Sequence, residues 1–327
     1  MSVKKQGPSQ PWQCILVCWG KKYSNTDINV LWKNIVLHDK SCVGCVLLTD
    51  RYRDGGAQTI KQKLIPTFFL QKKMLGTGCH AKLCMFEKGI LQPLIPAIYV
   101  DLDAAVFGPL GSLVSRMKHN KGLMIIQSGR GLSIGALRRF IYRINGGRKF
   151  ARANSSVVVF YPENWYPIAS SFRDKVDSGA PLEGEYLITD DRYIAWFAQL
   201  QLQAVPKSHV VKFGSEFVLP TGWLSKLKGR LPWVRRRRGA LVAVTLPGGD
   251  FKLSKLALLN DGDITYDYRG RPLFWDEKVM GVSKWICADA DMGRTPVLVR
   301  LDVPADTHLG ELLFLLDTSF AACAVSV

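Results

Sequence analysis

The chain has 327 residues, enough for one large α/β domain or two smaller ones. Hydrophobic residues make up 47% of it and charged residues 22%, which is typical of globular proteins and excludes extensive disorder. The net charge of +17 indicates an anionic partner, either a nucleic acid, an acidic membrane surface or a phosphorylated substrate. No apolar run approaches the ~20 residues of a membrane span, and the eight cysteines suggest no disulfide scaffold, so we expect a cytoplasmic protein that can lie at the inner face of a membrane.

The first hundred residues alternate between strand and helix patterns. Short apolar runs predict strands over residues 13–19, 42–48, 59–64 and 97–100. Helical spacing of apolar residues predicts helices over residues 26–37 and 82–89, and a further helix from residue 111. This alternation is typical of a mainly parallel sheet with helices on both faces.

The second half is less regular. Strands are predicted over 123–126 and 156–160 and a helix over 186–199, whereas the Gly- and Arg-rich residues 129–153 are interpreted as a surface excursion. Turn signals make the last ninety residues look β-rich. We therefore divide the chain into a flexible start (1–11), one α/β domain (12–285, with halves 12–115 and 116–285) and a β-rich C-terminal extension (286–327).

Three predicted strands end in residues suited to ligand binding: Gly20–Tyr23, Thr49–Asp50 and Asp101–Asp103. Ligands of parallel α/β sheets bind beyond the carboxyl ends of the strands. These three segments are therefore expected to form one site.

The strongest chemical signal is the stretch IYVDLDAAVFGPLGSL at 98–113. In an extended D-x-D, Asp101 and Asp103 project to the same side, and two acids directly after an apolar strand are costly to place without a cation or donors. Carboxylate oxygens suit Mn²⁺ or Mg²⁺, which would neutralise a leaving diphosphate. Two further D-x-D pairs, at 261–263 and 289–291, are interpreted as turn and surface acids.

This stretch resembles the D-x-D region of GT-A glycosyltransferases, closest to the glycogenin-like and lipopolysaccharide-galactosyltransferase-like group. Other pieces follow in the same order: CILVCWGKKY at 14–23, LLTD at 47–50, Lys82 in HAKLCMF, NSSV at 154–157 and the pair Asp190–Asp191. The resemblance covers about residues 13–200. It implies a GT-A-type, mainly parallel sheet flanked by helices, as in the nucleotide-diphospho-sugar transferases.

The resemblance also implies a reaction: metal-dependent transfer of a hexose from a nucleotide diphosphate sugar, with a UDP-sugar favoured, to a hydroxyl on a glycan or lipid-linked acceptor. The anomeric configuration would be retained. The resemblance implies that Asp101 and Asp103 bind the metal. It also implies that Asp191, Asp190 and Asn154 lie beside the donor sugar. The nucleotide contacts are Trp19, Gly20, Tyr23, Asp50, Lys82 and Lys252.

The sequence departs from the family at the third metal ligand, a His that precedes a Gly. The counterpart here is VTLPGGDFKL at 244–253, which has no His, so that Asp250 would have to replace it. Several of the assigned residues also have a simpler interpretation. Tyr23 would only pack against its neighbours, Asp50 would only end a strand, and Lys82 would be an ordinary solvated cation. Asp190 and Asp191 would cap the helix that follows them.

Two other functions remain open. A nucleotidyltransferase would share the sheet and the metal, although WGKKY is a poor phosphate loop. A catalytically degenerate fold would act as a basic module that binds a membrane or a nucleic acid. In the transferase as in such a module, the run Arg235, Arg236, Arg237 and Arg238 after Pro-Trp-Val favours an anionic membrane surface, and nucleic acid is not expected because no recognisable nucleic-acid-binding module surrounds the run.

Overall fold

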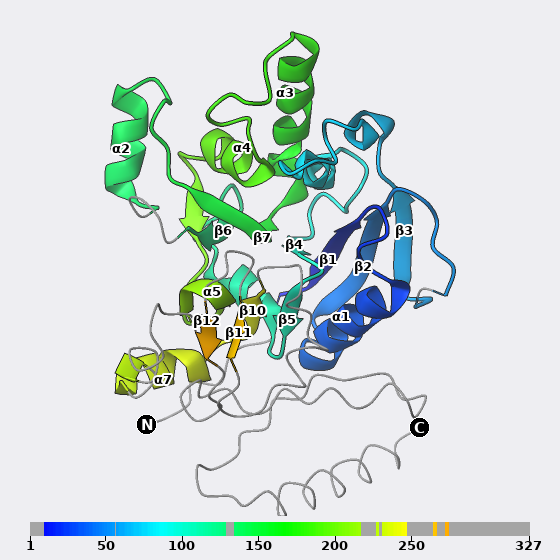
Figure 1. The fold of residues 1–327 in the computed structure, drawn as a ribbon, viewed down its shortest axis with the longest axis vertical. Coiled ribbons are helices and arrows are strands. Elements are labelled where there is room, and N and C mark those ends of the chain that lie inside the picture. The colour runs from blue at the N-terminus through cyan, green and yellow to red at the C-terminus, as the bar shows by residue number, and fades with distance from the viewer. Residues whose placement is uncertain are drawn as a thin grey trace, which may run out of the picture.

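The computed structural model of the protein describes residues 10–55, 57–128, 134–216, 227–228, 231–246, 264–266 and 272–274. Its centre is a seven-stranded sheet in the order β3-β2-β1-β4-β7-β6-β8 (Figure 1). In chain order these strands are β1 (Trp12–Cys18), β2 (Cys42–Thr49), β3 (Ile60–Leu64), β4 (Ala97–Val100), β6 (Leu123–Gln127), β7 (Ala153–Phe160) and β8 (Leu202–Ala204).

The sheet is mainly parallel, as the sequence predicts. β7 runs antiparallel to both of its neighbours, β4 and β6, whereas the other neighbouring strands of this sheet pair in parallel. Because β7 is reversed, its N-terminal end lies at the same edge of the sheet as the C-terminal end of β4. This arrangement brings Asn154 and Ser155 towards the D-x-D segment.

A second, three-stranded sheet is built from β5 (Ala104–Val106), β10 (Ala243–Thr245) and β9 (Val210–Lys212), in that order. β5 pairs antiparallel with β10, and β9 pairs parallel with β10. Since β4 ends at Val100 and β5 begins at Ala104, residues 101–103 form the link between the two sheets. The two aspartates of the D-x-D are thus fixed from both sides.

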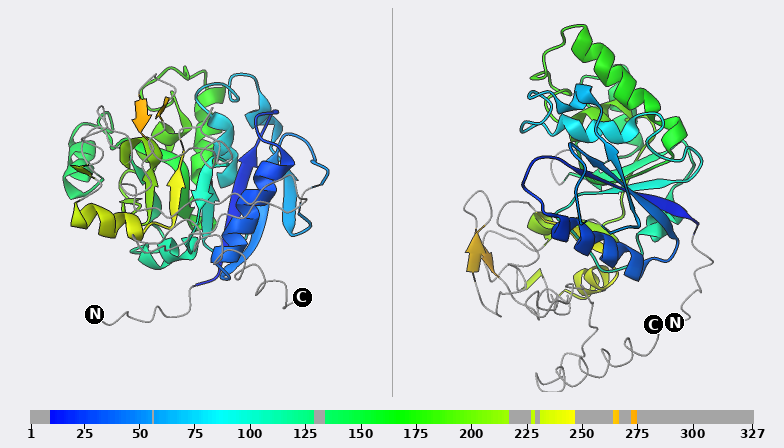
Figure 2. Two further views of the ribbon diagram at one scale, coloured as in Figure 1. Left: turned by 60° about the horizontal axis from the view of Figure 1, so that its bottom comes forward. Right: turned by 90° about the vertical axis from the view of Figure 1, so that its right-hand side faces the viewer.

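Helices cover both faces of the large sheet (Figure 2). One face carries α1 (Asn25–His38), which begins in a capping box formed by Ser24 and Asp27, together with the 3₁₀ helix η3 (Leu110–Arg116). The other face carries the 3₁₀ helix η2 (His80–Phe86), α3 (Tyr166–Asp177) and α4 (Asp190–Phe197). Each face holds its own apolar core, and β1 contributes side chains to both by strand alternation.

The remaining elements are short. They are η1 (Thr67–Leu70), η4 (Pro162–Asn164), α2 (Ala136–Ile144), α5 (Phe213–Glu216), α7 (Pro232–Gly239) and the hairpin of β11 (Ile264–Tyr266) with β12 (Pro272–Phe274). Within the described residues, no helix is both long and apolar enough to cross a membrane.

The predicted elements need three corrections. The helices expected over 82–89 and from 111 are 3₁₀ helices, and each starts earlier, at His80 and Leu110. The helix expected over 186–199 begins only at Asp190, because the Thr189 side chain caps it by accepting from the Arg192 amide. The surface excursion at 129–153 contains a helix, α2, with no buried residue. The extension 286–327 lies outside the described residues.

Candidate active site

The D-x-D segment leaves the large sheet with its two acids on one side. The amide of Asp101 donates to the Ser156 carbonyl at 2.9 Å, which continues the β4–β7 pairing by one residue. The Asp103 carbonyl accepts from the Leu246 amide, next to β10. Leu102, between the acids, is buried in the core of the α1 face. The two acids do lie on one side, but the segment is a turn closed by the Ala104 amide donating to the Asp101 carbonyl at 2.9 Å, so the extended D-x-D expected from the sequence is wrong.

Asp101 is held by two donors, the buried Tyr99 and the largely buried Lys82. Lys82 Nζ lies 2.7 Å from its Oδ2, and the Tyr99 hydroxyl donates to its Oδ1 at 2.7 Å. Although burial alone would lower it, the charges of Asp101, Tyr99 and Asp190 raise the pKa of Lys82 well above its usual value. Burial and Asp101 raise the pKa of Tyr99 as well. Lys82 is thus a cation fixed at the site, and the solvated interpretation of it is wrong.

Asp103 is less well satisfied. The Tyr23 hydroxyl lies 3.4 Å from its Oδ2, while its Oδ1 is buried with no hydrogen-bond partner among the described residues. Burial and the nearby charge of Asp101 raise the pKa of Asp103 to about 7. The carboxylate of Asp103 therefore has an unused acceptor atom and a negative charge that its surroundings disfavour. A bound cation would occupy the acceptor atom and stabilise the charge.

Asp190 and Asp191 reach the same place from the start of α4. Asp190 is buried, and its Oδ2 accepts from the Ser155 hydroxyl of β7 at 2.6 Å. Burial and Asp191 raise the pKa of Asp190 to about 7, against the opposing effect of Lys82. Asp191 accepts from the Thr189 hydroxyl. The N-cap of α4 is Thr189, so neither acid is the cap, although both lie in the first turn of the helix as the simpler interpretation expects. We refer to Asp101, Asp103, Asp190 and Asp191 as the acidic cluster.

Asn154 stands beside Ser155 on β7. Its Oδ1 is buried and has no hydrogen-bond partner within the described part of the chain. It is a second unused acceptor at this edge of the sheet, and a ligand hydroxyl or amide would satisfy it.

The ends of β1 and β2 form a separate part of the edge. Asp50 Oδ2 accepts from the Gly20 amide at 3.0 Å and contacts Arg51 Nη1 at 2.8 Å. Arg53 donates to the carbonyls of Gly20 and Tyr23. Asp50 therefore organises the loop after β1, where Gly20 has a positive φ of 67°. Trp19, just before it, packs partly buried against the core of the α3 face.

Lys212, at the end of β9, belongs to the site and was not predicted. Burial lowers its pKa, and the carboxylates of Asp191, Asp103 and Asp101 oppose that change, which places its ammonium group in the field of the acidic cluster. The segment HVVKFG that carries it gave no motif, and only the three-residue strand pairing with β10 brings it here. Lys252, the other cation assigned from sequence, lies outside the described residues, as does Asp250.

The oxygen atoms of the acidic cluster fit a hard divalent cation that is also coordinated by a bound phosphate group. Asp101 and Asp103 supply carboxylate oxygens on one side of one turn, and Asp103 Oδ1 is free to coordinate. No group of three His, Cys, Asp or Glu suited to a metal occurs in the described ranges. Mg²⁺ and Mn²⁺ sites that use two carboxylates complete their shells with phosphate oxygens and water.

The four arginines of α7 do not form the single membrane-binding patch predicted from the sequence. Arg238 is buried and, with Arg237, is bound to Glu216 at 3.1 and 2.7 Å. These two side chains fasten α7 to the body of the protein, so a membrane patch made of all four arginines is wrong. Arg235 and Arg236 are exposed.

No family model matches the chain, and no curated protein matches it in sequence. Among solved structures, the bifunctional glycosyltransferase WbbM in its apo form superposes with a TM-score of 0.50 and 10% identity over 76% of this chain and 48% of that one. The chain has the GT-A glycosyltransferase fold. The match spans about half the length of WbbM, and at this identity it establishes the fold alone.

Two further solved structures are similar to parts of the chain. The galactosyltransferase LgtC, in complex with donor and acceptor sugar analogs, matches at a TM-score of 0.47 and 12% identity over 74% of this chain and 88% of that one. The glycosyltransferase GlyE of Streptococcus pneumoniae matches at 0.47 and 14% identity, over 74% and 56%.

Proposed function

We propose that the protein is a metal-dependent glycosyltransferase that moves a hexose from a nucleotide diphosphate sugar, with a UDP-sugar favoured, to a hydroxyl on a glycan or lipid-linked acceptor. The observation that carries the proposal is the half-satisfied carboxylate of Asp103, beside Asp101, at the sheet edge of a GT-A fold. Asp101 is already ion-paired with Lys82, so it is Asp103, with its unused buried oxygen, that has the chemistry of a cation ligand.

The diphosphate would be bound between charges of opposite sign. Asp101 and Asp103 would hold Mn²⁺ or Mg²⁺, which when bound offsets the charge of the leaving diphosphate. Lys82, already 2.7 Å from Asp101, would fix the orientation of that carboxylate and face the phosphates. Lys212 would supply a second cation from β9, where the acidic cluster favours its protonated form.

The donor sugar would lie against the start of β7 and α4. Asn154 Oδ1 would accept a hydrogen bond from a sugar hydroxyl, and Asp190 would accept another or hold a proton, since its pKa of about 7 allows both states near neutral pH. The nucleoside would contact the loop after β1 through Trp19, Gly20 and Tyr23, whose shape Asp50 maintains. Retention of configuration is proposed from the family resemblance alone, and the cytoplasmic location stays a prediction.

One observation favours a catalytically degenerate protein with the same fold. Lys82 occupies one oxygen of Asp101 and Tyr99 the other, and the described residues provide no third metal ligand. A protein of this kind would bind neither Mn²⁺ nor sugar nucleotides.

A thermal-shift panel separates the two functions. UDP-, GDP- and CMP-sugars are added to the full chain with Mn²⁺ or with EDTA, and the melting temperature is recorded. The proposal predicts that one donor raises it only when Mn²⁺ is present, and that Asp101→Ala combined with Asp103→Ala abolishes the rise. Asp177→Asn, an exposed acid on α3, is the matched control and should keep it. A panel with no response would favour the degenerate protein.

A further inference from the structure

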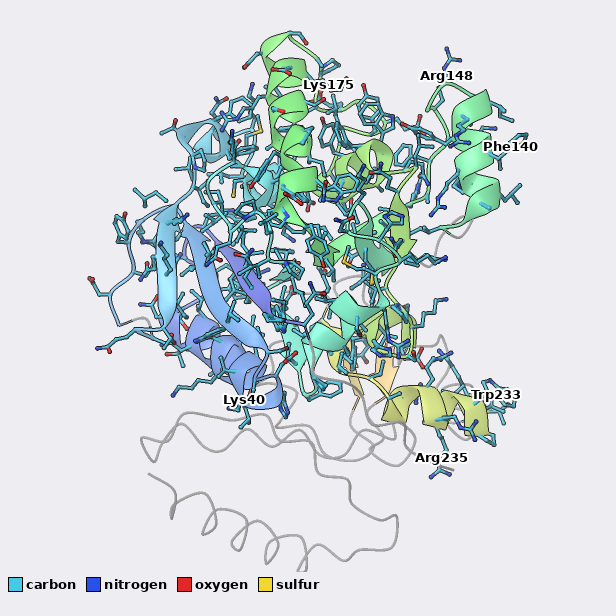
Figure 3. All side chains as sticks on the ribbon, turned by 180° about the vertical axis from the view of Figure 1, so that it is seen from behind. Lys40, Phe140, Arg148, Lys175, Trp233 and Arg235 are labelled. Carbon is cyan, nitrogen blue, oxygen red and sulfur yellow. The ribbon has the colours of Figure 1, made fainter. Side chains whose placement is uncertain are left out.

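Helix α2 carries its apolar side chains on the outside. Leu137, Phe140 and Ile144 are 64%, 60% and 67% exposed, and their spacing of three and four residues places them on one stripe of the helix. Phe140 points away from the body of the protein (Figure 3). A helix on a globular domain ordinarily buries such a stripe against the core.

The opposite side of α2 faces the body and is largely polar. The guanidinium of Arg139 donates to the Leu202 carbonyl at 2.9 Å, and Tyr142 packs partly buried against the core of the α3 face. Arg138 and Arg139 are both less exposed than the three apolar residues. The helix is therefore anchored by its polar side, so turning it to bury the apolar stripe would break these contacts.

The surroundings of the stripe are strongly basic. Residues 134–152 contain Arg138, Arg139, Arg143, Arg148, Lys149 and Arg152, and no acidic residue. Helix α7 lies along the same side of the molecule as α2 (Figures 1 and 3) and adds Trp233, which is 65% exposed, with the exposed Arg235 and Arg236. Trp and Arg together are typical of side chains at the boundary between lipid and water.

We propose that this side of the protein, formed by the apolar stripe of α2 and by Trp233 with Arg235 and Arg236 of α7, binds an anionic lipid bilayer. The three apolar side chains would enter the headgroup boundary, and the surrounding arginines would neutralise lipid phosphates. The positive charge of this surface favours binding to an anionic lipid bilayer over self-association, because two such basic surfaces would repel each other. The inference does not depend on the acidic cluster.

Vesicle co-sedimentation of the full chain tests the proposal. Vesicles of phosphatidylcholine with about one third phosphatidylglycerol are compared with vesicles of phosphatidylcholine alone. The wild type should sediment with the anionic vesicles, and Leu137→Ser, Phe140→Ser and Ile144→Ser combined should lower the partition coefficient at least ~tenfold. Far-UV circular dichroism and melting temperature establish that the variant is folded.

A matched control removes three exposed apolar residues elsewhere: Leu37→Ser, Val43→Ser and Leu94→Ser. It should sediment as the wild type does. Equal sedimentation of the α2 variant and this control would overturn the proposal, as would a wild type that ignores anionic vesicles. A concentration-dependent dimer in analytical ultracentrifugation that the α2 variant loses would also overturn it and assign the stripe to self-association. Mn²⁺-dependent donor binding is measured in parallel and should be unchanged in both variants.

Discussion

Replacing Asp103 by Asn tests the electrostatics of the acidic cluster without changing its shape. Burial and Asp101 raise the pKa of Asp103 from its ordinary 3.8 to about 7. Each pKa unit corresponds to about 1.4 kcal/mol, so ionised Asp103 destabilises the folded chain by at most roughly 4 kcal/mol. Solvent screening of this partly exposed side chain reduces the effect, and we expect about 2 kcal/mol.

The sign of the effect depends on pH. Between pH 4 and 7, Asp103 is protonated in the folded chain and ionised in the unfolded chain, so its contribution to stability falls as the pH rises through this window. Asn carries no charge at any pH. Asp103→Asn should therefore match the wild type closely near pH 4 and melt about 3 °C higher at pH 8.

The assay is thermal unfolding in EDTA at both pH values, with Asp177→Asn as the control, repeated at pH 8 with Mn²⁺ and UDP. Mn²⁺ with UDP should raise the melting temperature of the wild type and of the control but not that of Asp103→Asn, because the amide lacks the negative charge that holds the cation. An Asp103→Asn variant that is no more stable at pH 8 than the wild type would refute the reasoning, since ionisation of Asp103 would then not destabilise the folded chain.

Three further substitutions test separate contacts. Lys82→Met should weaken Mn²⁺-dependent donor binding at least ~tenfold in calorimetry, because the fixed cation beside Asp101 is lost; unchanged affinity would remove Lys82 from the site. Asn154→Ala should weaken binding of the sugar nucleotide but not of UDP, and equal losses for both would contradict its place beside the sugar. Glu216→Gln should lower the free energy of unfolding by about 3 kcal/mol in urea titrations, because the buried guanidinium of Arg238 loses the negative charge of the carboxylate beside it; a change below ~1 kcal/mol would contradict this.

The large sheet and the position of Asp101 and Asp103 at its edge could be predicted because their signals are local. The strands around 13–19, 42–48 and 97–100 are apolar runs, and the two acids of the D-x-D follow the last of them directly. Parallel strands then bring their carboxyl ends to one edge, so Asp50 and Asp101 could be assigned to the same region before their contacts were known.

Residues whose roles depend on distant partners could not be predicted. Lys212 lies near the acidic cluster because it ends a three-residue strand, β9, and a strand this short has no apolar pattern from which it could be predicted. Arg238 looks like part of a solvated run, yet Glu216, 22 positions away, pairs with it in the interior. The stripe of α2 has an ordinary amphipathic spacing, and only the structure shows that it faces outward.

Binding of Mn²⁺ in the presence of UDP, followed by electron paramagnetic resonance, measures the central claim most directly. With the wild type, the signal of free Mn²⁺ should fall in a saturable way that requires UDP, and with Asp101→Ala combined with Asp103→Ala it should stay at the level of Mn²⁺ and UDP without protein. Equal loss of the free signal in the two proteins would contradict the assignment of the metal to these aspartates.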